Sequence, residues 1–127
     1  MVLTDKEFNE YLISIDGLIN ANNGEKILNT DFFQIGQGWN LLVKNLIEDL
    51  IKMGWNKEVT QVKEKFGGLR FYVTENKSYI QQRIIDTELD SIMICEETGK
   101  SGKLRTDIGW YRTLCDEEYD RIISKNI

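Results

Sequence analysis

The sequence predicts an α+β fold, in which N-terminal helices pack on a small antiparallel sheet and a short hairpin–helix subregion follows. Three observations predict it. Apolar residues from Trp39 to Ile51 recur at helical spacing, and residues from Leu69 to Val73 alternate between apolar and polar. The segment after Cys95 is short and rich in turn residues. Helices and strands therefore occupy separate stretches of the chain.

Length and composition indicate one globular domain, 1–127, with 95–127 as its subregion. Of the 127 residues, 41% are hydrophobic and 29% charged, which is typical of a globular protein. No apolar run approaches the roughly 20 residues that span a membrane, and the N-terminus lacks an apolar signal core. We therefore expect a cytoplasmic protein with no membrane contact, whose two cysteines are reduced.

The first helix begins at a capping box. Thr4 can cap the first turn, Glu7 stands three residues later, and Leu3 and Phe8 occupy the positions of a hydrophobic staple. Apolar residues continue at helical spacing as far as Ile19. The pattern predicts a helix that runs until Asn22-Asn23-Gly24 breaks it.

The strongest helix signal covers Trp39 to Ile51. Gly36-Gln37-Gly38 precedes it as a flexible break, and Gly54 can end it in a left-handed conformation. The glycine pair lacks the Lys-Ser/Thr of a nucleotide loop and the third glycine of a dinucleotide fingerprint. We interpret it as a turn.

Two strands should follow, Val59–Lys65 and Leu69–Val73, pairing antiparallel around Gly67-Gly68. We expect this hairpin to pack on the helix before it. Its polar face should combine basic residues with an aromatic one: Lys63, Lys65, Arg70 and Tyr72. Such a face can stack a base or hold a phosphate, but the acidic chain and Glu64 favour a purely structural role.

The remaining elements are shorter. A third helix is predicted from Ser78 to Ile94, with an apolar side formed by Ile80, Ile84, Ile85, Leu89, Ile92 and Met93. Lys103–Thr106 and Gly109–Leu114 resemble short strands, and Asp116–Ser124 a terminal helix.

Counting ligands argues against a metal in the subregion. A structural zinc site needs two cysteine pairs or histidine replacements. Thr98 stands where a partner of Cys95 should be, and Glu118 where a partner of Cys115 should be, and the chain has no histidine. We expect two free, buried cysteines, with a disulfide left open, and neither a metal nor a cofactor.

Charge is distributed unevenly. The chain carries −5 in all, yet Asp86 to Asp120 holds ten acids and four bases, hence −6. This balance disfavours nucleic acid and favours a basic protein partner. The candidate partner-binding residues combine acids with two possible aromatic anchors: Glu96, Glu97, Tyr111, Asp116, Glu117, Glu118 and Tyr119.

Two motifs resemble those of a family of small, mostly uncharacterised phage, prophage and toxin-neighbourhood proteins. The first is Lys-Glu-Lys-Phe-Gly-Gly-Leu-Arg-Phe-Tyr, from Lys63 to Tyr72. The second combines Cys95-Glu-Glu-Thr-Gly, Gly109-Trp110 and Thr113-Leu114-Cys115-Asp116. The resemblance implies a zinc-stabilised knuckle in many members, which is degenerate here at Thr98 and Glu118. It also implies a genomic context of mobile elements and toxin immunity genes.

No residue set specifies a reaction, because serine and cysteine have no histidine to activate them and the paired acids lie in turn-rich segments. We therefore expect a non-enzymatic protein-binding protein, an immunity protein that neutralises a cognate bacterial toxin with a basic surface, such as a nuclease. The alternative is a phage or prophage accessory protein whose degenerate knuckle contacts nucleic acid or a host factor.

Overall fold

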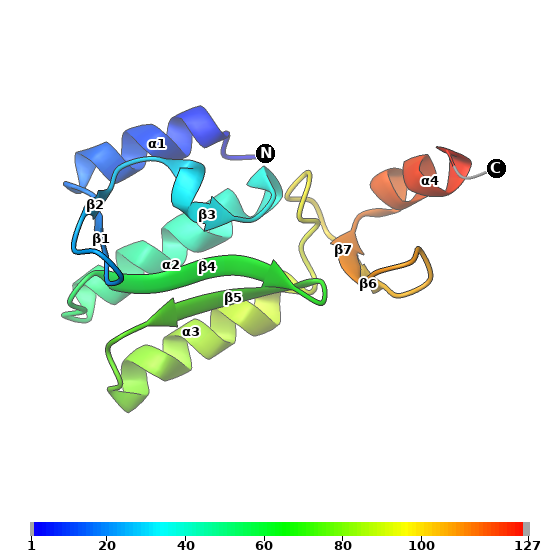
Figure 1. The fold of residues 1–127 in the computed structure, drawn as a ribbon. Helices are drawn as coiled ribbons and strands as arrows, with labels where there is room; N and C mark the ends of the chain where they lie inside the picture. The colour runs from blue at the N-terminus through cyan, green and yellow to red at the C-terminus, as the bar shows by residue number, and fades with distance from the viewer. Residues whose placement is uncertain (1, 126–127) are drawn as a thin grey trace.

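The computed structural model describes residues 2–125, which form a two-layer α+β fold with a C-terminal appendage (Figure 1). The helices are α1 (Asp5–Ser14), α2 (Asn40–Lys52), α3 (Ser78–Ser91) and α4 (Asp116–Lys125). The strands are β1 (Leu18–Asn20), β2 (Lys26–Ile27), β3 (Phe33–Gln34), β4 (Glu58–Lys65), β5 (Gly68–Val73), β6 (Lys103–Arg105) and β7 (Arg112–Leu114). Two 3₁₀ turns, η1 (Thr30–Phe32) and η2 (Gln37–Trp39), complete the list.

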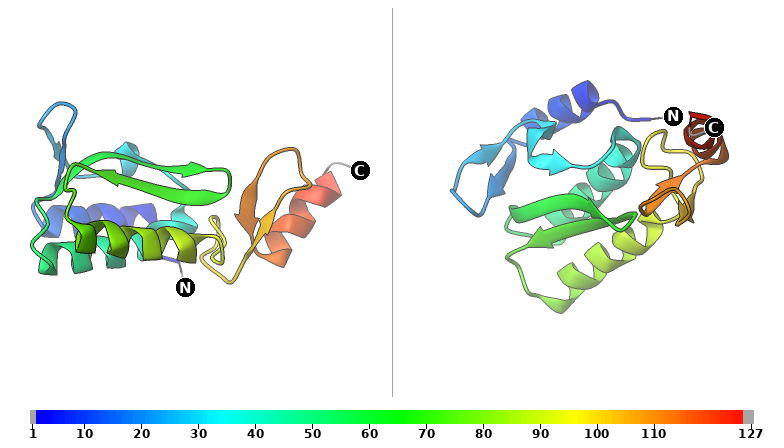
Figure 2. Two further views of the ribbon diagram at one scale, coloured as in Figure 1. Left: turned by 90° about the horizontal axis from the view of Figure 1, so that it is seen from below. Right: turned by 45° about the vertical axis from the view of Figure 1, so that its right-hand side comes forward.

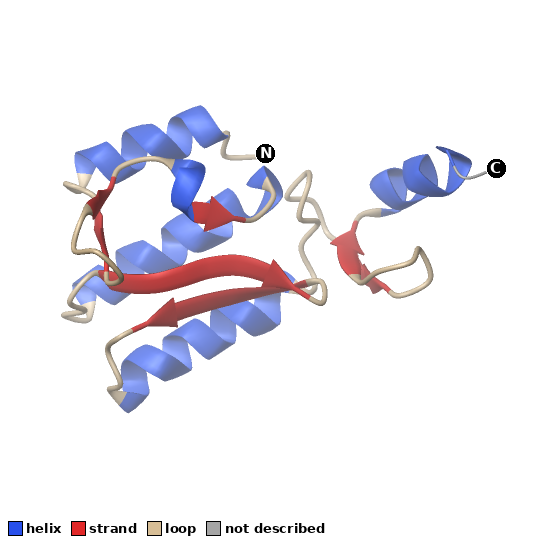
Figure 3. Ribbon diagram, in the orientation of Figure 1, coloured by secondary structure: helices blue, strands red, loops and turns tan. Residues whose placement is uncertain are grey.

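The predicted α+β class is confirmed, and the sheet is mixed rather than purely antiparallel. The central strand β4 pairs antiparallel with β5 on one edge. On its other edge β4 pairs parallel with β1 and then with β3. Helices α1, α2 and α3 all lie on one side of this sheet, so its other face carries no helix (Figure 2, left, and Figure 3).

The core lies between α2 and the β4–β5 hairpin. Val43, Leu46 and Leu50 on α2 are fully buried in one cluster with Val62 and Phe71 of the hairpin. Their i, i+3, i+7 spacing places them on one side of the helix. The predicted packing of the hairpin on this helix is therefore confirmed.

The first helix ends earlier than predicted. Its capping box at Thr4 and Glu7 is present, but α1 stops at Ser14. Asp16 and Gly17 then take positive φ angles of 60° and 73°, and the Gly17 N–H bonds back to the Leu12 carbonyl. This left-handed reversal sends the chain out of the helix and into β1, so the apolar residues after it belong to a strand.

The tight turn of the β4–β5 hairpin is one residue earlier than predicted. Lys65 pairs with Gly68, so the two-residue loop is Phe66-Gly67, with φ angles of 53° and 81°. Two positive φ angles match the right-handed twist of the flanking strands. An aromatic residue thus occupies the first left-handed position.

The C-terminal subregion has a small core of its own. Cys95, Leu114 and Cys115 are buried together with Ile108, and α4 packs Tyr119 and Ile122 against them. β6 and β7 form a separate two-stranded antiparallel sheet, shorter than the predicted strands. Figure 2 (left) shows this hairpin beyond the tip of the β4–β5 hairpin.

Candidate functional site

The knuckle-like loop, residues 95–102, begins at Cys95 and lies beside Cys115 at the end of β7; both cysteines are free and buried. The Thr98 hydroxyl lies 3.6 Å from the Cys115 sulfur and donates to it. Burial raises the pKa of the Cys95 thiol, but hydrogen bonds from Thr98 and from the Cys115 N–H outweigh it, so the pKa is lowered overall. Within residues 2–125, no group of three or more His, Cys, Asp or Glu side chains can hold a metal ion.

Glu96, which the sequence places among exposed acids, is buried at 6% exposure. Its carboxylate accepts hydrogen bonds from the Arg112 guanidinium at 3.1 Å and from the Thr113 N–H at 3.1 Å. Burial raises the pKa of Glu96, and these two donors lower it only in part. The Arg112 guanidinium is itself desolvated, yet Glu96 and Glu97 raise its pKa. Glu96 therefore fastens the loop to β7.

The other predicted acids are paired, and of these Glu97, Asp116 and Glu117 are exposed while Glu118 is half-buried. Glu97 bonds to Arg112, and Asp116 to Arg105 at 2.8 Å. Glu117 pairs with Lys100 and Glu118 with Arg121. Because each acid has a basic neighbour inside the subregion, their field at a partner is much reduced.

The two predicted aromatic anchors lie in different surroundings. The Tyr119 hydroxyl donates to Asp107, and the Arg105 guanidinium lies 4.3 Å from the centre of its ring, so Tyr119 braces α4. Tyr111 is 47% exposed and makes an edge-to-face contact with Phe66, with ring centres 6.3 Å apart. Only Tyr111 is free to contact another molecule.

The solvent side of α3 carries an apolar stripe. Only Ile80 and Ile84 of its predicted apolar side are buried. The other four residues recur at i, i+4, i+7 and i+8 and stay exposed: Ile85 (44%), Leu89 (60%), Ile92 (39%) and Met93 (59%). This set is called the α3 stripe below.

Acids border the α3 stripe. Asp86 and Asp90 are exposed on the same helix, and neither forms an ion pair with any residue of the described range 2–125. Exposed contiguous apolar side chains on a monomer commonly mark an interaction surface. The stripe and its two acids were not singled out by the sequence, although the adjacent apolar pairs Ile84-Ile85 and Ile92-Met93 exceed what one buried helix side can hold.

The open face of the sheet collects basic residues. Lys63 on β4 lies directly opposite Arg70 on β5, and Gln61 lies opposite Tyr72. Because side chains alternate along a strand and Val62 and Phe71 point into the core, these residues point outward. The predicted basic and aromatic face is present.

The tip of the hairpin extends this face. Lys65 places its ammonium 5.7 Å from the centre of the Phe66 ring. Phe66, Gly109, Trp110 and Tyr111 line a shallow hollow between the tip and the β6–β7 loop. Phe66 of the first sequence motif and Gly109-Trp110 of the second, some 40 residues apart in the chain, therefore meet at this hollow.

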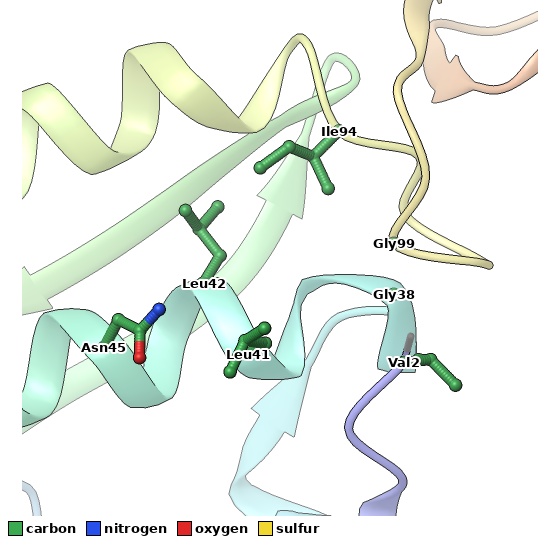
Figure 4. A pocket seen from close by; sticks show the side chains of 7 residues that line it. All are labelled: Val2, Gly38, Leu41, Leu42, Asn45, Ile94 and Gly99. Carbon is green, nitrogen blue, oxygen red and sulfur yellow. The ribbon is translucent and has the colours of Figure 1, made fainter.

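A pocket between the start of α2 and the knuckle-like loop is small (Figure 4). Its volume is about 130 Å³, and Leu41, Leu42, Asn45 and Ile94 contribute side chains to its wall. Pockets for small molecules usually hold roughly 300 Å³ or more. No titratable side chain lines it, so it supplies no acid or base for a reaction.

A scan against protein-family models found no match, and neither curated proteins nor solved structures gave one. None of the helices within residues 2–125 combines the length and apolar character needed to cross a membrane.

Proposed function

We propose that this protein acts by binding another protein, as an immunity protein that neutralises a cognate bacterial toxin in the cytoplasm. The observation that carries the proposal is the α3 stripe. Leu89 on α3 is 60% exposed, and Met93, two residues beyond the end of α3 at Ser91, is 59% exposed. Burying such side chains against a partner is worth roughly 1.5–3 kcal/mol each.

Charge indicates the chemistry of the partner. Asp86 and Asp90 border the stripe without an ion pair to any residue in 2–125, although Asp86 accepts a hydrogen bond from Gln82, and the chain carries −5 in all. A toxin that acts on nucleic acid needs a basic cleft to hold phosphates. Such a cleft, lined by apolar residues and rimmed by lysine or arginine, complements the α3 stripe and its acids. A second copy of this chain would instead bring its own acids against them.

The proposal moves the expected interface from the acids of the C-terminal subregion to α3. The acids from Glu96 to Glu118 are tied to neighbouring arginines and lysines, so they supply less attraction than their number suggests. Free charge at Asp86 and Asp90 supports steering of the partner toward α3. Glu117, at the exposed end of the subregion, remains a candidate for the rim of the interface.

The test is toxin neutralisation by variants. The protein is used as bait in the source cell, the stoichiometric partner is cloned, and its toxicity is measured with the protein co-expressed. Leu89→Gln/Met93→Gln should weaken binding at least tenfold and abolish rescue. The matched control Ile13→Gln/Leu41→Gln removes two exposed apolar side chains, 62% and 44% exposed, from α1 and α2. Equal loss in both variants would contradict the assignment to α3.

A further inference from the structure

We propose that the open face of β4–β5, together with the aromatic tip beside it, binds single-stranded nucleic acid. The site consists of the cations Lys63, Lys65 and Arg70 and the aromatic residues Phe66, Tyr72, Trp110 and Tyr111, and is called the basic–aromatic strip below. It lies on the sheet rather than on α3, and its argument does not depend on the proposed protein partner.

The first observation is a like-charge pair without an ion-pair partner in residues 2–125, although the Arg70 guanidinium donates a hydrogen bond to the Leu69 carbonyl at 2.9 Å. Lys63 and Arg70 are direct cross-strand neighbours, and like charges in that position are destabilising. In a chain with 21 acids and 16 bases, neither forms an ion pair with a residue of the described segment 2–125. The nearby Glu64 is engaged elsewhere, since its carboxylate accepts from the Gly67 N–H at 2.6 Å. An anion from outside would relieve the repulsion.

The second observation is the strained aromatic at the tip. Phe66 has a φ of 53° and is 67% exposed. A left-handed conformation costs a non-glycine residue about 1–2 kcal/mol, and hairpin turns of this type favour asparagine or aspartate there. A large apolar ring held in that conformation and left in solvent adds little to folding. Such local strain is a feature of ligand-binding sites.

Two contacts connect these observations into one surface. The Lys65 ammonium lies 5.7 Å from the centre of the Phe66 ring, and the ring centres of Phe66 and Tyr111 are 6.3 Å apart. Trp110, 58% exposed, lines the same hollow. The strip therefore runs from Tyr72 at one end, past the three cations, to the aromatic tip with Trp110 at the other.

The ligand class follows from this combination. Exposed rings stack on unpaired bases, and cations beside them hold the phosphates between those bases. From Tyr72 to Gly68 the strand covers about 14 Å, and the aromatic tip extends it, so the strip accommodates about four nucleotides. The bases of a duplex are already stacked on each other, so a single strand is required. The whole-chain charge disfavours nucleic acid, and Glu88 of α3 reaches β5, where its carboxylate accepts a hydrogen bond from the Phe71 N–H. The three cations of the strip must outweigh both.

The test measures fluorescence anisotropy of labelled fifteen-residue oligothymidylate and oligouridylate with the full chain at low salt. Binding should weaken as salt rises, with a logarithmic slope of about −2 for three phosphate contacts. Phe66→Ala should weaken binding at least fivefold, which is the lower limit expected for one stacked base. Lys63→Gln/Arg70→Gln should weaken it about tenfold and flatten the salt dependence. Comparing the two oligonucleotides distinguishes DNA from RNA.

Matched control variants distinguish a loss of the basic–aromatic strip from a general loss of positive charge or of an exposed aromatic ring. Lys6→Gln/Lys52→Gln removes the same charge from α1 and α2, and Tyr79→Ala removes an aromatic side chain, 50% exposed, from α3. Both controls should bind like the parent. The proposal is overturned by absence of binding to both oligonucleotides, or by equal losses in strip and control variants. It is also overturned if strip variants lose only a protein partner and the parent binds no oligonucleotide.

Discussion

The Thr113 hydroxyl donates a buried hydrogen bond to the carbonyl of Gly67, 2.6 Å away and 46 residues earlier in the chain. This bond joins the tip of the β4–β5 hairpin to β7 of the C-terminal subregion. A methyl group on Gly67 would come within 2.4 Å of the Leu104 side chain, so the approach is close. The bond fixes how the β6–β7 loop, which carries Trp110 and Tyr111, lies against Phe66.

Replacing Thr113 by valine should lower the free energy of unfolding by about 1–3 kcal/mol. Valine keeps the shape of the side chain but leaves the buried Gly67 carbonyl without its donor. Thr113→Ser keeps the hydroxyl and serves as the control. Urea unfolding of both variants measures the difference. A valine variant as stable as the serine variant would show that the hydrogen bond contributes nothing.

The core of the main layer is tested at Leu46. This side chain is fully buried, so Leu46→Asp places a carboxylate in an apolar cluster and should cost at least about 3 kcal/mol. Leu41→Asp on the same helix, where the side chain is 44% exposed, should cost far less. Thermal unfolding followed by circular dichroism compares them. Equal melting temperatures would mean that the assigned buried side of α2 is wrong.

How far the sequence predicts this fold depends on the length of each element. The thirteen-residue α2 and the long β4–β5 hairpin are predicted because several turns or alternations repeat the same signal. β1, β2 and β3 have two or three residues each, too few to show any period. The end of α1 was missed because apolar spacing continues past the left-handed residues at Asp16 and Gly17.

The candidate sites were predicted less completely, because the residues that form them lie far apart in the chain. The outward basic face follows from strand alternation and was predicted. The pairing of Glu96 and Glu97 with Arg112 joins residues 15 and 16 positions apart, which composition cannot reveal. Likewise, only the folded chain brings Phe66 beside Tyr111.

The pH dependence of stability should identify Glu96. Burial raises its pKa above the ordinary value of 4.5, so folding favours the protonated carboxyl. The resulting stabilisation is complete below the ordinary pKa and is lost as the pH rises through the raised pKa. The stability of the parent relative to Glu96→Gln should therefore decrease as the pH rises above the ordinary pKa of 4.5. Urea unfolding of the pair as the pH is raised measures it, and a difference that grows with pH would contradict the sign.

The knuckle-like loop should be independent of zinc. The purified protein is expected to contain no stoichiometric zinc and to unfold identically with and without chelator, because only Cys95 and Cys115 supply thiolates. Thr98→Cys/Glu118→Cys restores both cysteine pairs and should acquire about one zinc per chain. Elemental analysis of both proteins measures the zinc content per chain. One zinc in the parent, with loss of folding in chelator, would refute the ligand count.

The tip residue links stability to the proposed strip. Phe66→Asn puts a residue that tolerates the left-handed conformation at a φ of 53°, and should raise the free energy of unfolding by up to about 1 kcal/mol. Little buried apolar surface is lost, since Phe66 is 67% exposed. Gly67→Ala in the same turn should act in the opposite direction, because φ is 81° and the added methyl meets Leu104.

Oligonucleotide binding by Phe66→Asn tests whether the backbone strain at Phe66 serves ligand binding. If Phe66 stacks a base, Phe66→Asn should be more stable than the parent and bind oligothymidylate at least fivefold more weakly. Unfolding and anisotropy measurements on one preparation give both values. A variant that gains stability and keeps its affinity would show that the Phe66 ring at the tip is not a stacking platform and would remove it from the strip.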